Sequence, residues 1–461
     1  MCYTTKHLNK KEFQMKKTLL LSAVASTMIM AGGDIAPVEP VVEVATPAPA
    51  AVSGWDFSGQ GVVYYQTVSD SYDFYKADDL YHGGALQAGH AFNAAKKDTF
   101  SQANSAASAG VSLSAVNKDI FGGLGAGVKL IGLGTLGLEK DVVSGVMQSV
   151  NGADTLNGGA ITELYLTYGV GNTIAKVGRQ ELPKALSPLA FSESWNVFAN
   201  TYEAAVLVNS DIPDTTLVGA WVRGANSHTK MQKFDKVNGS DGVFMLTAAN
   251  KSIEGVGLTG SIYYAPDYVT KDDLIAGWLD AAFDIGDYTA GLQAGIIDHK
   301  AFNKETLAFG GKIGGKIDNG MSFGLAATDV NNGGLDTREL GGIDARGVFN
   351  VGGGSDILGD NALYTTSPLG SNVLANSSDA TTISAKVGMD ALGGHFCLLG
   401  DWSDTGTDNK LGKGDFYEGA LVYNTTVGAL DLTAGYVYQN VDTTDFDMDN
   451  NIIRAVARYN F

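Results

Sequence analysis

The chain from residue 54 onward is a series of segments in which apolar and polar residues alternate, separated by clusters of Gly, Asn and Asp. Alternation with a period of two predicts β-strands with one apolar and one polar face. We count eighteen such segments of about ten residues, the length of a membrane-spanning β-strand. No run of about 18 apolar residues occurs after residue 33, so membrane-spanning helices are not predicted.

The eighteen segments can be placed along the chain. They lie near 57–66, 109–116, 124–131, 161–168, 173–177, 202–208, 216–223, 243–249, 256–264, 274–283, 288–297, 306–317, 321–328, 381–389, 395–402, 417–424, 430–439 and 451–461. Each proline after residue 53 falls between these segments, where a missing N–H removes no hydrogen bond between strands.

The connections between the segments alternate in length. Short ones, such as 169–172, 284–287 and 318–320, are mostly separated by longer ones, of which 329–380 is the longest. Short turns on one rim and long loops on the other are typical of outer-membrane barrels, and a β-sandwich has no reason to segregate them. We therefore expect an all-β fold, a transmembrane antiparallel β-barrel of about 18 strands.

Charged residues fall on one face of each expected strand. In the last segment, Arg454 and Arg458 share one parity, whereas Ile453, Ala457 and Tyr459 share the other. A lipid-facing Arg or Lys costs roughly 2 to 4 kcal/mol at the membrane midplane, while a water-filled lumen accepts the charge. The polar parity therefore predicts which residues face the lumen.

This parity places positive and negative side chains on the inner wall in nearly equal number. The expected positive pore-lining residues are Lys129, Lys176, Arg223, Lys312, Lys316, Lys386, Arg454 and Arg458. The expected negative ones are Glu163, Glu203, Asp280, Asp284, Asp401, Glu418 and Asp431. Two interpretations of Arg454 and Arg458 stay open: they guide solutes, or they pair with acids across strands and keep the pore wet.

Composition excludes several kinds of partner. The chain has 461 residues, 50 acidic and 31 basic, and a formal net charge of −19. Such an acidic surface repels phosphates, which argues against a nucleic-acid partner. With 6 His, 2 Cys and no Cys-x-x-Cys spacing, neither a Cys/His metal site nor a disulfide framework is predicted. We expect no metal and no cofactor.

The N-terminal segment has the pattern of an export signal. Two lysines after Met15 precede a 13-residue apolar region, and small residues end this region at Gly33. We expect residues 1–33 to be a signal peptide with translation starting at Met15. Residues 34–53, rich in Pro and Ala, form an expected periplasmic linker, and residues 54–461 the barrel.

Three short segments resemble the OprD-type family of outer-membrane porins and the related major porins of Campylobacter-like bacteria. They are 177–182 (VGRQEL), 200–204 (NTYEA) and 211–217 (DIPDTTL). The resemblance implies an eighteen-stranded channel, monomeric or trimeric, with a third loop folded inward as a constriction and a lumen whose basic residues serve carboxylate-bearing solutes. That loop would be Gly178 to Thr201, with Arg179, Glu181, Lys184, Glu193 and Trp195 as its constriction residues.

The C-terminus resembles the terminal strand that outer-membrane barrels present to their assembly machinery. Tyr459 and Phe461 lie on one face of this strand and form the expected assembly signal. The expected partners are outer-membrane lipid and lipopolysaccharide, the barrel assembly machinery and small solutes.

These patterns favour a passive diffusion channel in the bacterial outer membrane and not an enzyme. Two alternatives stay open: a surface adhesin that uses the long loops 68–108 and 329–380, and a barrel enzyme. A hydrolase would need a Ser, a His and an acid on facing lumen positions, and the parity places only His395 there.

Export can be tested directly. We expect mass spectrometry of the protein purified from outer membranes to show Asp34 as the first residue, because signal peptidase cleaves after small residues such as Gly33. A mature N-terminus upstream of Met15 would contradict the export interpretation.

Overall fold

The computed structural model describes most of the chain after the expected linker. The described residues are 54–74, 99–151, 157–193, 196–227, 230–268, 272–298, 305–317, 320–335, 362–365, 379–407, 412–444 and 446–461. The expected signal peptide and linker, residues 1–53, lie outside them.

The described chain is built almost entirely of β-strands. They are β1 (Asp56–Phe74), β2 (Ser105–Phe121), β3 (Leu124–Gly134), β4 (Gly158–Val170), β5 (Thr173–Gln180), β6 (Tyr202–Asn209), β7 (Thr215–Ser227), β8 (Lys230–Lys236), β9 (Val243–Ile253), β10 (Val256–Tyr268), β11 (Asp272–Ile285), β12 (Tyr288–Asp298), β13 (Thr306–Ile317), β14 (Met321–Asn331), β15 (Ala380–Ala391), β16 (Gly394–Thr405), β17 (Gly414–Val427), β18 (Leu430–Thr443) and β19 (Phe446–Asn460). Two short 3-10 turns, η2 (Gln102–Asn104) and η3 (Leu138–Lys140), accompany them. No helix within the described ranges is long and apolar enough to cross a bilayer.

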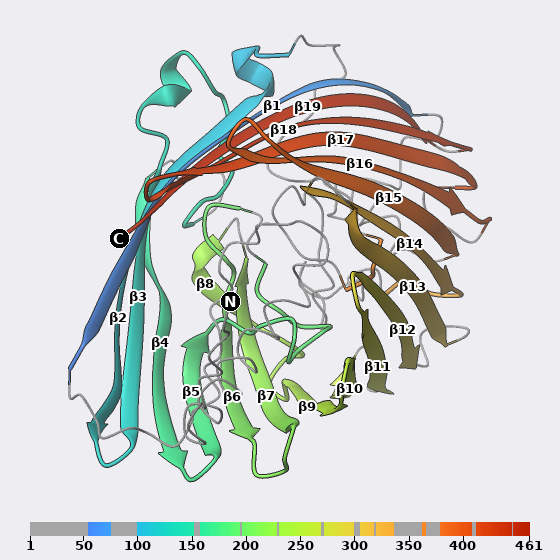
Figure 1. The fold of residues 1–461 in the computed structure, drawn as a ribbon. Helices are drawn as coiled ribbons and strands as arrows, with labels where there is room; N and C mark the ends of the chain where they lie inside the picture. The colour runs from blue at the N-terminus through green and yellow to red at the C-terminus, as the bar shows by residue number, and fades with distance from the viewer. Residues whose placement is uncertain are drawn as a thin grey trace, which may run out of the picture.

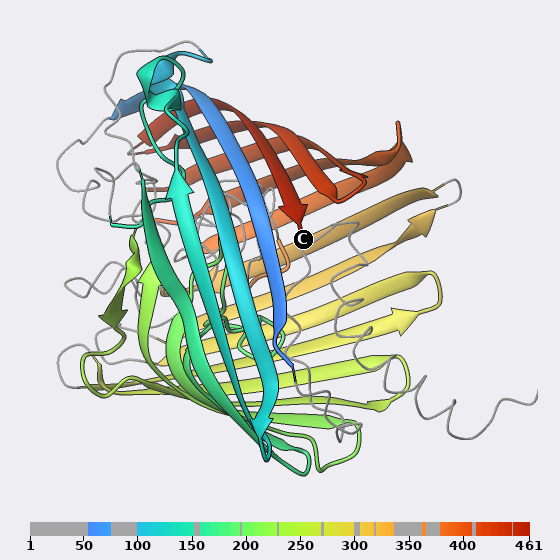
Figure 2. The ribbon, with the colours of Figure 1, turned by 90° about the vertical axis from the view of Figure 1, so that its left-hand side faces the viewer.

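Eighteen of the strands form one closed antiparallel sheet (Figures 1 and 2). β1 pairs with β19, from Gln60 opposite Asn460 to Phe74 opposite Phe446, and this pairing closes the ring. Closure gives every strand two hydrogen-bonded neighbours, as the interior of a bilayer requires. The predicted antiparallel barrel of about 18 strands is confirmed.

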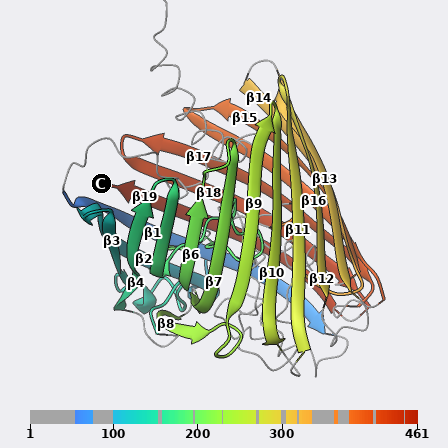
Figure 3. The ribbon, with the colours of Figure 1, turned by 90° about the horizontal axis from the view of Figure 1, so that it is seen from below.

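The extra strand, β8, lies outside the ring (Figure 3). It pairs with the end of β7, while β7 also pairs with β9 as the next wall strand. The sequence does not predict β8, because residues 230–236 are rich in lysine and lack an apolar parity.

Short turns define one rim of the barrel and longer loops the other. The turn between β4 and β5 and the turn between β11 and β12 each contain a glycine with left-handed backbone, Gly171 (φ 60°) and Gly286 (φ 68°). Two-residue hairpin turns need this conformation, and glycine adopts it without steric cost. The predicted segregation holds for most connections, although 269–271 between β10 and β11 and 444–445 between β18 and β19 are short connections on the long-loop rim.

The two faces of the wall differ as the parity predicts. On β11, Leu279 is 64% exposed while its neighbour Trp278 is 2% exposed; on β12, Leu292 is 61% exposed and Gln293 is 5% exposed. The exposed side chains point away from the barrel and are apolar, which suits a lipid environment. The buried side chains point inward.

One proline lies inside a strand, contrary to expectation. Pro266 belongs to β10, where the pairing with β11 jumps from Ala265 to Tyr268. The irregularity leaves Pro266 out of the ladder, so its missing N–H removes no hydrogen bond between strands.

Closure generates a prediction about electrophoretic mobility. Because the ring has no free strand edge, detergent has no place to begin unfolding the sheet. We expect the unheated protein to migrate faster in a denaturing gel than the boiled protein. Mobility that does not change on boiling would contradict a closed barrel.

A second prediction concerns the last residue. Phe461 exchanges two backbone hydrogen bonds with Gly59, at 2.7 and 3.0 Å, and its ring packs where a Gly59 side chain would lie. We expect Phe461→Ala to lower the amount of barrel assembled in the outer membrane without changing the conductance of each channel. Phe57→Ala, which removes another outward aromatic ring, is the control. Equal yields of Phe461→Ala and the parent would refute the assembly role.

Candidate functional site

Residues 181–201, between β5 and β6, fold into the barrel (Figure 1). Leu189 and Phe191 in this inner loop are at most 1% exposed. The Leu189 N–H donates to the Tyr263 hydroxyl of β10 at 3.0 Å, and the Tyr202 hydroxyl donates to the Phe191 carbonyl at 2.9 Å. The inner loop begins three residues later than expected because β5 continues to Gln180.

The far end of the inner loop lies against the opposite wall. Arg458 of β19 donates to the carbonyls of Val197 at 2.8 Å and Asn196 at 2.5 Å. Gln148, from the loop between β3 and β4, forms two hydrogen bonds of 2.7 Å with the backbone of Phe198. Because β10 and β19 are the ninth and eighteenth strands of the ring, the inner loop crosses the lumen.

An ion-pair cluster supports the start of the inner loop. Lys129 of β3 lies 2.7 Å from Glu181 and 3.6 Å from Glu163 of β4. Lys176 of β5 is close by, with its ammonium group 3.8 Å from the centre of the Tyr165 ring. The two lysines and two glutamates balance in charge, so this part of the wall supports the loop without adding net charge.

A second segment reaches the inner wall from the long connection after β14. The Tyr364 hydroxyl donates to Asp280 of β11 at 2.6 Å, and Lys312 of β13 lies 4.2 Å from its ring centre. Burial and, to a smaller extent, the nearby Asp280 carboxylate raise the pKa of Tyr364 above its ordinary range, so the hydroxyl keeps its proton. Gly291 of β12, between β11 and β13, leaves room for the Tyr364 ring: a Cβ placed on Gly291 would lie 2.7 Å from the Tyr364 hydroxyl oxygen.

Three lysines occupy neighbouring levels of the inner wall toward the short-turn rim. Lys312 and Lys316 share the inward face of β13, and Lys386 on β15 lies across Gly324 of β14. In register, Gly324 pairs with both Gly314 and Lys386, which places Lys386 at a level between the other two lysines. This strip of lysines is the densest positive feature that the structure places on the inward face of these strands.

The remaining predicted lumen residues also lie on inward faces. Arg454 donates to Gln66 at 2.9 Å, and the Gln439 amide donates to Glu418 at 2.7 Å. Asp431 stands opposite Arg458 in register. Asp284 and Asp401 share the inward parity of their strands.

The inward assignment is wrong for Arg223 and Glu203. Arg223 is exposed and alternates with buried Val222 on β7, while Glu203 alternates with buried Ala204 on β6. Glu203 pairs with Arg179 at 3.1 Å, and Arg179 lies in β5 rather than in the constriction loop. These charges sit near the long-loop rim, beside a register shift in the pairing of β6 with β7, where the outer face reaches water.

The other expected constriction residues differ in their placement. Glu193 is buried in the inner loop, and its N–H donates to the Asn200 side chain at 2.7 Å. Lys184 lies 5.8 Å from the Phe191 ring centre. Trp195 lies outside the described residues.

The structure brings a serine and an acid next to His395, which the parity did not show. His395 Nδ1 lies 2.7 Å from Asp390 Oδ1. A Cβ placed on Gly388 would lie 2.5 Å from Ser322 Oγ and 2.7 Å from His395 Nε2. Among the described residues, however, Nε2 has no hydrogen-bond partner, so Ser322 is not joined to the pair as a nucleophile requires.

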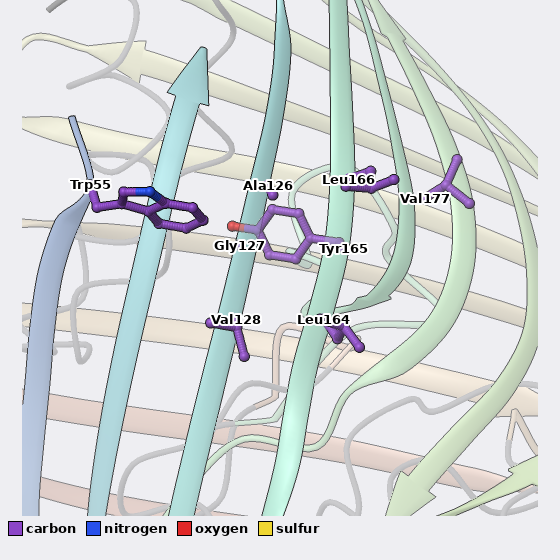
Figure 4. A pocket seen from close by; sticks show the side chains of 8 residues that line it. All are labelled: Trp55, Ala126, Gly127, Val128, Leu164, Tyr165, Leu166 and Val177. Carbon is purple, nitrogen blue, oxygen red and sulfur yellow. The ribbon is translucent and has the colours of Figure 1, made fainter. Parts of the chain in front are cut away.

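An apolar groove of about 250 Å³ lies beside β3 and β4 (Figure 4). Its lining includes Trp55, Val128, Leu164, Leu166 and Val177, all without charge. Leu164, Leu166 and Val177 are more than half exposed on the outer face of the wall. The groove therefore opens on the lipid-facing surface, and its lining also includes Tyr165, whose ring lies beside the Lys176 ammonium group.

Comparison with known proteins supports the fold. No protein-family model and no curated protein matches the chain. OpdQ of Pseudomonas aeruginosa matches with a TM-score of 0.63 and 12% identity, covering 88% of this chain and 97% of its own. OpdK, an outer-membrane protein of the same organism, matches with a TM-score of 0.61 and 14% identity, covering 87% of this chain and 98% of its own. OccAB4 of Acinetobacter baumannii matches with a TM-score of 0.57 and 12% identity, covering 87% of this chain and 98% of its own. These structures share the barrel fold and support the OprD-type architecture; the relation to porins of Campylobacter-like bacteria stays a prediction.

The ion pair that supports the inner loop generates a prediction. Glu181→Gln leaves half-buried Lys129 with only its longer contact to Glu163. We expect a loss of about 1 to 3 kcal/mol in the stability of this region, seen as faster proteolysis within 181–201. Glu203→Gln breaks the more exposed pair with Arg179 and serves as the matched control, with an expected loss of about 0 to 1 kcal/mol. Equal proteolysis of the two variants would contradict the supporting role of Lys129.

Proposed function

We propose that the protein is an outer-membrane porin, a passive diffusion channel for small hydrophilic solutes and ions. The observation that carries this proposal is a loop held across the lumen of a closed barrel whose outer face is apolar and whose inner face is charged. A barrel that served only as an anchor would need neither the inner loop nor the charged wall.

Passage of solutes depends on the narrowness of the lumen. Solutes enter from the long-loop rim, and the inner loop and the segment around Tyr364 limit the width of the passage. Wall charges set ion preference, because a charge in a narrow pore bordered by protein is screened less than in bulk water. The candidate pore-lining residues are Lys129, Lys176, Lys312, Lys316, Lys386, Arg454, Arg458, Glu163, Asp280, Glu418 and Asp431.

The location and partners belong to the same proposal. The apolar outer face contacts outer-membrane lipid and lipopolysaccharide, after export by the signal peptide of residues 1–33. Tyr459 and Phe461, whose rings stack 6.0 Å apart on the outer face, are presented to the barrel assembly machinery. The barrel functions as a monomer or a trimer.

Carboxylate-bearing solutes are the proposed preference. The strip of Lys312, Lys316 and Lys386 provides ammonium donors at successive levels, so a carboxylate can pass from one to the next. A solved structure of OpdK, 14% identical to this chain with a TM-score of 0.58, contains vanillate, which is a carboxylate.

Channel formation can be tested on the purified protein. In planar bilayers we expect discrete single-channel steps and, in solute-exchange experiments, partial current block by vanillate. An adhesin or a barrel enzyme would insert without such steps. Absence of conductance from heat-modifiable, correctly folded protein would refute the porin proposal.

The lysine strip generates a prediction about selectivity. Removing two positive charges by Lys316→Gln with Lys386→Gln is expected to move the reversal potential toward cation preference. The shift should be large at 0.1 M salt and smaller at 1 M, where the screening length falls from about 10 to about 3 Å. Arg223→Gln, on the outer face, is the control and should leave the reversal potential unchanged. An equal shift in both proteins would contradict the proposed role of the strip.

A further inference from the structure

We propose that Arg458 is a latch that holds the inner loop across the lumen and so sets the width of the pore, rather than a residue that guides solutes. This inference rests on the proposed porin function and assigns Arg458 as a positioning residue within it.

The first argument is the direction of the Arg458 hydrogen bonds. Its two terminal nitrogens donate to consecutive backbone carbonyls, Asn196 at 2.5 Å and Val197 at 2.8 Å, and one of them also reaches Gln60 at 3.3 Å. A guanidinium can donate to two neighbouring acceptors at once because its donors have a fixed planar arrangement. Donors engaged in this way are turned toward the loop and not toward a passing solute.

The second argument is that the wall is shaped to receive this part of the loop. Arg458, Val62, Gly110 and Leu133 lie in one row across β19, β1, β2 and β3. A Cβ on Gly110 would lie 2.6 Å from the Phe198 ring and 2.7 Å from a Val197 methyl carbon, so only glycine leaves room for the loop.

The third argument is the energetic cost of release. Arg458 is 9% exposed, and Val197 and Phe198 belong to a buried apolar cluster with Val62 and Leu133. Withdrawing the loop would expose these apolar side chains and leave a buried charge without two acceptors, and each lost charge-assisted hydrogen bond is costly. Arg458, on the closing strand of the barrel, therefore holds this end of the loop together with Gln148 and the apolar cluster.

Arg454 is the matched comparison in the same strand: it is 1% exposed, and its described hydrogen bonds go to the wall and not to the inner loop. It lies on the same inward face of β19, four residues before Arg458, and donates to the Gln66 side chain of the neighbouring wall strand. The two arginines carry the same charge at neighbouring levels, so comparing them separates the effect of charge from the effect of the latch.

The test compares Arg458→Lys with Arg454→Gln in single-channel recordings. Arg458→Lys keeps the charge but cannot donate to both carbonyls in the same geometry. We expect a larger conductance level whose occupancy rises about tenfold over the parent, since one lost charge-assisted hydrogen bond corresponds to at least that change, with the reversal potential unchanged. Arg454→Gln should shift the reversal potential toward cations and keep the parent's conductance level.

Proteolysis gives a readout that does not need conduction. Cleavage within residues 181–201 should be faster in folded Arg458→Lys than in Arg454→Gln. Gly110→Val, which fills the space of the loop without touching any charge, should also speed cleavage and raise conductance. If Arg458→Lys and Gly110→Val match the parent in both conductance and cleavage, the latch is refuted. If no variant and no parent conducts but cleavage differs as expected, the porin proposal fails and the latch stands.

Discussion

The whole structure depends on satisfying the backbone hydrogen bonds of a sheet whose outer face is apolar. A bilayer interior offers no water to unpaired N–H and C=O groups, so the sheet has to close on itself. The pairing of β1 with β19 achieves this, and the exchange of hydrogen bonds between Gly59 and Phe461 extends it to the last residue. Once the sheet is closed, each strand has one face toward the outside and one toward the lumen, and most charges lie on the second, apart from those such as Arg223 and Glu203 near the long-loop rim.

A closed barrel of this circumference encloses more space than its own inward side chains fill, and loops occupy part of it. The inner loop packs on a buried cluster that includes Leu189, Tyr263 and Trp278, and Leu363 from the long connection after β14 joins the same cluster. This apolar packing lies toward the long-loop rim, whereas Lys316 and Asp431 lie toward the short-turn rim. Charged side chains also lie toward the long-loop rim, as Asp401 of β16 and Glu418 of β17 do, so charge and packing share that part of the lumen.

The sequence predicts what repeats along the chain. All eighteen wall strands, the inward direction of residues such as Lys129 and Arg454, and the existence of an inner loop were predictable from alternation, from charge parity and from the resemblance to porins. Parity fails at Arg223 and Glu203 because strands extend beyond the bilayer, where an outward charge meets water and the rule loses its physical basis.

Contacts between distant segments were not predictable. Tyr364 on Asp280, Gln148 on Phe198 and Arg458 on the inner loop each join positions without any pattern to relate them. The only sequence trace of such contacts is a glycine on an inward strand position, and glycines are common throughout this chain. Arg458 shows the limit most clearly: its face was predictable, while its role depended on a loop that parity does not position.

The inward glycines of the wall make room for side chains that come from other segments of the chain. Gly110 faces the Val197 and Phe198 side chains, Gly291 faces the Tyr364 hydroxyl, and a Cβ on Gly324 would lie 2.9 Å from the Lys386 side chain. Because glycine has no side chain, each of these positions leaves room on the inner surface for a group that comes from another part of the chain. A single methyl group added at one of these positions would displace a group that enters from a distant loop or strand. The width of the lumen can thus change through mutations of the wall that alter no charge and no loop residue.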